Sequence, residues 1–146
     1  MRYAISACLT GVNCKYSGGN NLENELMEYI KDKEYMTICP EVLGGLPIPR
    51  LSCEIVDGKI LNTANEDCTE AFYVGARIAL EQIIEYQADI VILQPRSPSC
   101  GVGHIYDGTF QGRLKDGNGI FVEMLLKEGI PAMTWEEFSA STRKEQ

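Results

Sequence analysis

Hydrophobic residues occur along the chain in short β-prone runs separated by longer stretches with helical spacing. The short runs predict four strands, at Tyr3–Ala7, Tyr35–Ile38, Ile90–Leu93 and Pro131–Thr134. The longer stretches predict four helices, at Leu22–Lys31 (with Asn20 or Asn21 as its cap), Thr69–Tyr86, Ile120–Lys127 and Trp135–Ser141. Strands that alternate with helices are typical of an α/β fold. We therefore expect a single compact α/β domain over residues 1–146, with a mostly parallel, Rossmann-like sheet and flanking helices.

Three further segments depart from this alternation. The Asp57-Gly58 pair stands between β-prone pairs and predicts a small β-hairpin over residues 55–60. Val42–Arg50 contains two glycines and two prolines and is interpreted as an irregular loop of fixed shape. Gln94–Gly119 contains six glycines among polar residues and is interpreted as one long loop. A loop of that length without structure of its own is usually either functional or a wrong assignment.

Composition and charge narrow the classes of partner. The 146 residues are 45% hydrophobic and 23% charged, which is typical of a globular domain, and the formal net charge is −8. An acidic chain of this kind is not expected to bind nucleic acid, since it would repel a phosphate backbone. No apolar run approaches the about 20 residues that span a bilayer, and the first eight residues do not resemble a signal peptide. We expect a cytoplasmic protein that does not act on membranes.

Six cysteines are unusual for a chain of this size in a reducing compartment, where thiols more often serve metals or redox chemistry than disulfides. Cys8 follows the first predicted strand, Cys39 the second, and Cys100 lies in the loop after Ile90–Leu93. The carboxyl ends of parallel strands lie at one edge of a sheet, so these three thiols can converge. Thiolate ligands suit an iron–sulfur cluster or zinc, and three ligands leave one position open for chemistry.

The other cysteines have plainer interpretations. Free cysteine often behaves as a small buried hydrophobe, and this is the interpretation for Cys53 and Cys68. Cys14 lies on the same loop as Cys8, and could be a fourth ligand, a resolving thiol or a buried residue.

Polar residues near the expected sheet edge supply candidate chemistry. Glu41 follows Cys39 by two residues and could act as general acid or base, while Ser97 or Ser99 could bind substrate or orient water. Taken singly, each could equally be an ordinary loop carboxylate or turn cap. His104, the single histidine, is interpreted as a solvated or backbone-bonded side chain.

Four stretches resemble a bacterial family that carries the label of a domain of unknown function and includes the iron–sulfur-dependent thiouracil desulfidases. They are Ser6-Ala7-Cys8-Leu9 through Asn13-Cys14-Lys15-Tyr16, Cys39-Pro40-Glu41-Val42-Leu43-Gly44-Gly45-Leu46-Pro47 to Pro49-Arg50, Arg96-Ser97-Pro98-Ser99-Cys100-Gly101, and Ile105-Tyr106-Asp107-Gly108-Thr109-Phe110. The resemblance implies a [4Fe–4S] cluster held by Cys8, Cys39 and Cys100, with Glu41 and Ser97 as the acid/base and substrate-orienting groups. It also implies that the fourth iron takes the sulfur of a thiocarbonyl while water replaces it on carbon, without net redox change.

The expected function is therefore cluster-dependent desulfidation of a thiolated heterocycle such as thiouracil, with release of sulfide. The expected partner is a small thio-substrate. Gln94 stands where the family usually has lysine, and Leu51-Ser52-Cys53 where a Pro-Ala type of sequence is usual, so the substrate could differ. The alternatives are a non-catalytic iron–sulfur, zinc or sulfide-binding protein, and a zinc enzyme with three thiolates and a water.

Overall fold

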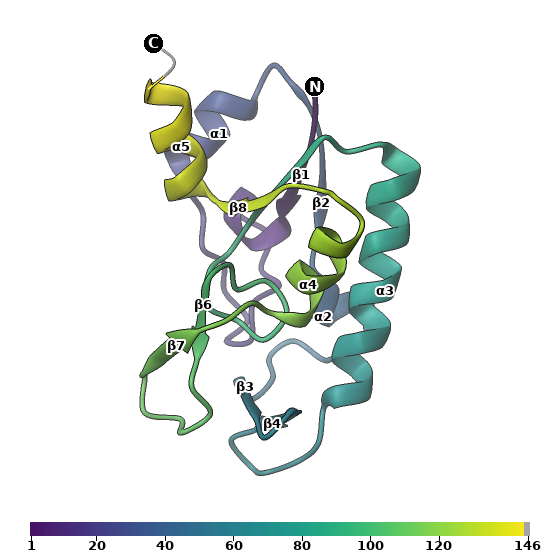
Figure 1. The fold of residues 1–146 in the computed structure, drawn as a ribbon, viewed down its shortest axis with the longest axis vertical. Helices are drawn as coiled ribbons and strands as arrows, with labels where there is room; N and C mark the ends of the chain where they lie inside the picture. The colour runs from purple at the N-terminus through teal and green to yellow at the C-terminus, as the bar shows by residue number, and fades with distance from the viewer. Residues whose placement is uncertain (145–146) are drawn as a thin grey trace.

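A four-stranded parallel sheet forms the centre of the molecule (Figure 1). The computed structural model describes residues 1–144. The strands are β1 (Arg2–Ser6), β2 (Glu34–Ile38), β5 (Ile90–Leu93) and β8 (Ala132–Thr134), in the order β2-β1-β5-β8. All three pairings are parallel. The predicted α/β fold with a parallel sheet is confirmed, and each predicted strand is present within two residues of its expected bounds.

Helices cover both faces of this sheet. On β5 all four residues are buried, with Ile90 and Ile92 in one core cluster and Val91 and Leu93 in the other. The first cluster is completed by side chains of α1 (Asn24–Ile30) and α5 (Trp135–Lys144), and the second by side chains of α3 (Thr69–Tyr86) and α4 (Ile120–Lys127). A strand buried on both faces explains the uninterrupted β-branched run in the sequence.

Two antiparallel hairpins extend from the sheet. The predicted hairpin is present as β3 (Cys53–Val56) and β4 (Lys59–Asn62), joined at Asp57 and Gly58. A second hairpin, β6 (His104–Tyr106) and β7 (Leu114–Asp116), lies inside the segment expected to be one long loop. Within β6 and β7 only Ile105 is buried, so the segment lacks the alternating apolar pattern by which strands are recognised.

A short helix, α2 (Pro40–Leu43), occupies the start of the segment interpreted as an irregular loop. It packs backbone to backbone on α3, because a Cβ added at Gly44 would lie 2.0 Å from the carbonyl oxygen of Ala71, and one added at Gly75 would lie 1.8 Å from that of Pro40. Only glycine allows so close an approach. The two glycines therefore fix the place of α2, and with it the residues just before and within it.

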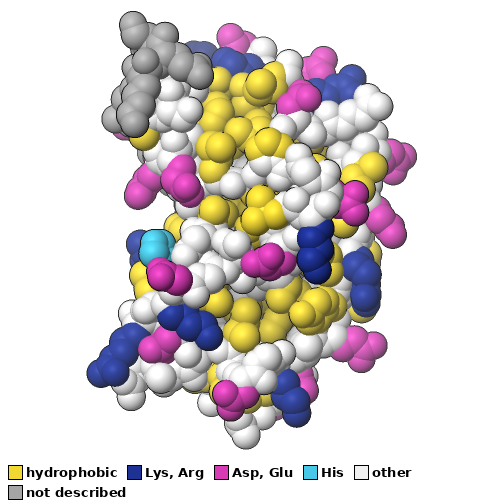
Figure 2. Space-filling model, in the orientation of Figure 1, with side chains coloured by type: hydrophobic (Ala, Val, Ile, Leu, Met, Phe, Trp, Pro, Cys, Tyr) yellow, Lys and Arg dark blue, Asp and Glu magenta, His cyan; other side chains and the backbone are white. Residues whose placement is uncertain are grey.

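Charged side chains are scattered rather than gathered on the face shown in Figure 2, where acidic and basic groups alternate with apolar patches. Within residues 1–144 the structure has no helix of the length and apolar character that crossing a membrane requires.

Candidate active site

A cavity of about 250 Å³ at the carboxyl end of the sheet gathers four of the six cysteines. Cys8 lies in a short 3-10 helix, η1 (Ala7–Thr10), that directly follows β1, and Cys39 lies between β2 and α2. Cys100 reaches the same cavity from the segment after β5. The three strands are neighbours in the sheet, and β1 and β5 flank the point where the strand order reverses, the usual position of a ligand crevice in such folds.

The fourth thiol, Cys14, is buried in this cavity between two of the expected ligands. The Cys39 thiol donates a hydrogen bond to the backbone carbonyl oxygen of Cys14 at 3.9 Å. The neighbouring Cys14 thiol lowers the pKa of Cys39 to about 6 and also lowers the pKa of Cys8. Burial has the opposite effect on Cys100, whose pKa it raises to about 12. The thiols thus form one interacting group.

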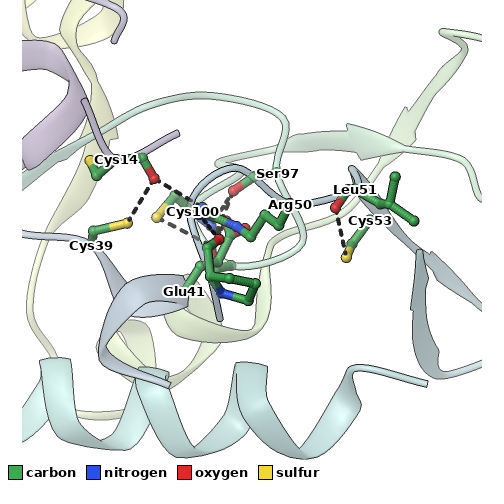
Figure 3. Close-up of polar contacts among 10 residues, drawn as sticks. Cys14, Cys39, Glu41, Arg50, Leu51, Cys53, Ser97 and Cys100 are labelled. Atoms are coloured by element: carbon green, nitrogen blue, oxygen red, sulfur yellow. Dashed lines mark hydrogen bonds and ion pairs between the residues drawn. The ribbon is translucent and has the colours of Figure 1, made fainter. Parts of the chain in front are cut away.

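Glu41 lines the cavity beside Arg50 (Figure 3) and has one partner on each of its carboxylate oxygens. Its Oε1 pairs with the Arg50 guanidinium, with Nε and Nη2 both at 3.3 Å, and its Oε2 accepts a hydrogen bond from Ser99 Oγ at 3.1 Å. The side chains of Arg50 and Glu41 are only 6% and 18% exposed. An ion pair so far removed from water has a defined geometry, unlike a surface salt bridge.

Arg50 also joins Glu41 to the cysteine loop. Its Nη2 donates to the carbonyl of Cys14 and its Nη1 to that of Pro47, each at 3.1 Å. Its own backbone N–H donates to the carbonyl of Tyr16 at 2.7 Å. Sequence reasoning did not single out Arg50 as a site residue, although the residue lies at the end of one of the motif stretches.

Ser97 and Ser99 form a short chain of hydroxyl groups ending at Glu41. Their Oγ atoms are 3.2 Å apart, and Ser97 Oγ also accepts a hydrogen bond from the backbone N–H of Cys100 at 2.8 Å. Ser97 lines the cavity, whereas Ser99 is fully buried behind it. Ser99 Oγ is also 3.5 Å from Cys100 Sγ. Ser99 therefore joins the carboxylate to a cysteine, a role that its sequence position alone did not reveal.

Polar side chains complete the wall of the cavity. Asn21 contacts the sulfur of Cys8 and accepts a hydrogen bond from Lys15 Nζ at 3.1 Å. Gln94 and Tyr106 also line the cavity. Tyr16 is a second aromatic residue of the lining, so the wall offers hydrogen-bond donors and acceptors together with two tyrosine side chains.

A second, wider hollow of about 760 Å³ adjoins the first and shares Asn21, Gln94 and Pro95 with it. It is visible beside the histidine at the edge of Figure 2. No cysteine lines it, and His104 there has a 65% exposed side chain, so the reactive groups belong to the smaller cavity. Cys53 and Cys68 lie outside both hollows, half-buried and in contact with each other.

The chemistry of the donor set in the cavity suits a soft metal centre. Cys8, Cys39 and Cys100 all line the cavity, and thiolate ligands select an iron–sulfur cluster or zinc. Among the described residues, no three His, Cys, Asp or Glu side chains are arranged to hold one metal ion. A [4Fe-4S] cluster differs from a single ion in that it binds each cysteine at a different iron.

Three comparisons relate the chain to known proteins. Residues 4–137 match the family model described as 2-thiouracil desulfurase. The uncharacterized protein YbbK of Bacillus subtilis (strain 168) is 34% identical over 145 residues, which cover 92% of this chain and 96% of that protein. The solved structure of TudS, a [4Fe-4S]-dependent thiouracil desulfidase, superimposes with a TM-score of 0.88 at 31% sequence identity, covering 95% of this chain and 93% of the other.

Proposed function

Because the chain belongs to the 2-thiouracil desulfurase family, we propose that it hydrolyses the carbon–sulfur bond of a thiolated heterocycle such as thiouracil and releases sulfide. One observation carries this proposal: thiols that follow three neighbouring strands line the same cavity as the half-buried Glu41–Arg50 pair. The thiols suit a soft, sulfur-binding centre, and the carboxylate suits activation of water.

Cys8, Cys39 and Cys100 would hold a [4Fe-4S] cluster in this cavity. When bound with three protein thiolates, such a cluster supplies an iron with an open position that can accept a thiocarbonyl sulfur as a Lewis acid. Cys14 is not needed as a ligand in this scheme, and its thiol lies next to two of the three.

Glu41 would take the proton of the attacking water. Arg50 and Ser99 occupy one oxygen each, so the carboxylate has a fixed orientation and a counterion before substrate arrives. Water adds to the carbon of C=S, the carbon–sulfur bond breaks, and the products are a carbonyl and hydrogen sulfide. Oxygen and sulfur exchange with no change in oxidation state, so no electron donor is required.

Ser97 would orient the substrate. With Ser99 donating to Glu41, the Ser97 hydroxyl donates to Ser99 and accepts from the N–H of Cys100. A hydroxyl oxygen has two lone pairs, so one remains on the cavity side to accept a ring N–H. A lactam-like ring can be held in this way with its thiocarbonyl toward the thiols.

The first test measures the reaction directly. Protein reconstituted anaerobically with iron and sulfide is incubated with 2-thiouracil in ¹⁸O-water, and uracil, sulfide and isotope content are followed. We expect many turnovers with one oxygen from water in each product, and Glu41→Gln should lower the rate by roughly 10²-fold or more with unchanged iron content. Exposed Glu81 on α3 provides the matched Glu→Gln control. Sulfide release limited to one equivalent, or a normal rate in the Glu41 variant, would contradict the proposal.

The second test concerns the ligands. Single serine substitutions of Cys8, Cys39 and Cys100 should each abolish iron retention and visible absorption, because each removes one bond to the cluster. Alanine at Cys53 or Cys68 is the matched control and should leave both intact, since neither residue lines the cavity. Full iron content in any one serine variant would remove that residue from the ligand set.

A further inference from the structure

Glu54 on β3 is the one carboxylate that the structure buries among residues 1–142, with 8% of its surface exposed. It does not line the cysteine cavity. Burying a carboxylate is costly unless several hydrogen bonds to it compensate the loss of water. The hydrogen bonds that Glu54 accepts therefore show which part of the chain its carboxylate holds in place.

Both hydrogen bonds to Glu54 come from a turn more than fifty residues away in the chain. Its Oε1 accepts the backbone N–H of Gly108 at 3.0 Å and that of Phe110 at 3.1 Å. The turn is also tied within itself, because Asp107 Oδ1 accepts the N–H of Thr109 at 3.0 Å. Glu54 thus fastens the turn at 107–110 to the β3–β4 hairpin.

The contact between turn and hairpin is close as well as polar. Gly108 has a φ of +92°, and a Cβ at this position would lie 2.6 Å from the carbonyl oxygen of Ile55. Phe110 adopts a φ of +58°, which a side chain of its size rarely takes without support. The backbone of the turn is therefore held in one conformation by the neighbouring strand.

This turn continues directly from a wall of the cavity. Tyr106 is the last residue of β6, one residue before the turn, and it lines the cavity together with Glu41 and Ser97. On its other side the Tyr106 N–H reaches the carbonyl of Arg96 at 3.4 Å. The position of Tyr106 is thus set from two directions, by its backbone hydrogen bond to Arg96 and by the turn that Glu54 holds.

We propose that Glu54 is a positioning residue for substrate binding: through the 107–110 turn it places Tyr106, one of the two tyrosines that line the cavity, as an aromatic surface against which the heterocycle lies. This inference rests on the proposed function. A planar ring gains from packing on an aromatic side chain, and the gain depends on where that side chain is held. Glu54 reaches neither the thiols nor Glu41 in this arrangement, so it acts on substrate affinity rather than on the cluster or on proton transfer.

The test compares Glu54→Ala with Glu54→Gln, which keeps an Oε1 acceptor. In the alanine variant we expect KM for 2-thiouracil to rise about tenfold, kcat to stay within about threefold and iron content to match the wild type. Hydrogen exchange at the amides of Gly108 and Phe110 should speed up. The glutamine variant should keep KM and exchange near wild type, as should alanine at Glu70, an exposed glutamate on α3.

Tyr106→Ala provides a second test if Glu54→Ala does not fold, because it removes the aromatic side chain and leaves the 107–110 turn and its hydrogen bonds to Glu54 in place. It should reproduce the rise in KM. Three results would overturn the proposal. The first is a normal KM in Tyr106→Ala, and the second is a normal KM in Glu54→Ala despite faster exchange of the two amides. The third is a fall in kcat of Glu54→Ala with no change in its KM. Iron-loaded wild-type protein without turnover would instead refute the proposed function, so the two failures are distinguishable.

Discussion

Gly75→Ala on α3 should destabilise the protein, which is the reverse of what this substitution does in an ordinary helix. Alanine in a helix interior is favoured over glycine by about 1 kcal/mol. At this position the added Cβ would lie 1.8 Å from the carbonyl oxygen of Pro40 and 2.7 Å from the backbone N of Gly44, whereas real Cβ contacts stay above 3.0 Å. Both atoms belong to backbone, so α2 must move away.

The expected size follows from these opposing effects. Overpacking a tight site costs about 1–3 kcal/mol, and a 1.8 Å approach to backbone belongs at the upper end. The gain of about 1 kcal/mol in helix propensity is subtracted from this cost, so the free energy of unfolding should fall by about 2 kcal/mol. For a chain of this length that corresponds to a Tm lower by about 6 °C. Because α2 begins directly after Cys39 and contains Glu41, iron retention should fall as well.

Denaturant unfolding of cluster-free protein measures the first effect, and iron content after reconstitution measures the second. Arg77→Ala, an exposed substitution on the same helix, should change stability by no more than about 0.5 kcal/mol. If Gly75→Ala raises the unfolding midpoint, α2 does not pack on α3 as described and the account of how Cys39 and Glu41 are placed is refuted.

Two other predictions concern the cavity. Arg50→Met should lower kcat more than tenfold, and Arg50→Lys should have an intermediate effect, because only the guanidinium contacts both Glu41 and the carbonyl of Cys14. Steady-state kinetics at equal iron content measures both variants. In cluster-free protein, brief iodoacetamide labelling of Cys39 should rise as the pH passes about 6, because the lowered pKa of this thiol makes thiolate available above that pH. Cys100 should stay unlabelled at neutral pH, because burial raises its pKa to about 12. Cys14→Ala should move the Cys39 profile to higher pH without loss of iron retention after reconstitution, as peptide mapping and iron assay would reveal.

Elements whose pattern lies within their own residues could be predicted from the sequence, and those that depend on tertiary contacts could not. The helices Thr69–Tyr86 and Ile120–Lys127 and the strand Ile90–Leu93 have the predicted bounds, because each has its full apolar pattern within its own residues. The four residues of α2 have no such pattern and depend on the packing of Gly44 against α3.

The candidate site shows the same division. Strand ends could be located from the sequence, so the three thiols were expected together, and the cavity does contain them. Arg50 was not assigned a role, and the link from Ser99 to Glu41 was not foreseen, because these contacts join residues far apart in the chain: Ser99 to Glu41, and Arg50 to the carbonyl of Cys14. Asn21, expected as a helix cap, instead contacts Cys8 and Lys15, and α1 begins three residues later.

The register of the sheet, rather than any local motif, determines where the thiols stand. Ser6 pairs with Ile38 at the end of β1 and β2, so Cys39 follows the last pair by one residue and Cys8 by two. A slip of one residue between these strands would move Cys39 along the strand by about 3.3 Å and reverse the face of every side chain in β2. That slip is prevented by the core, because Met36 and Ile38 of β2 pack in one core cluster, whereas Tyr35 and Thr37 on the other face are exposed. Apolar residues that touch no substrate therefore specify the spacing of the thiols, which explains how a thiol site can form in a chain that has no closely spaced cysteine pair.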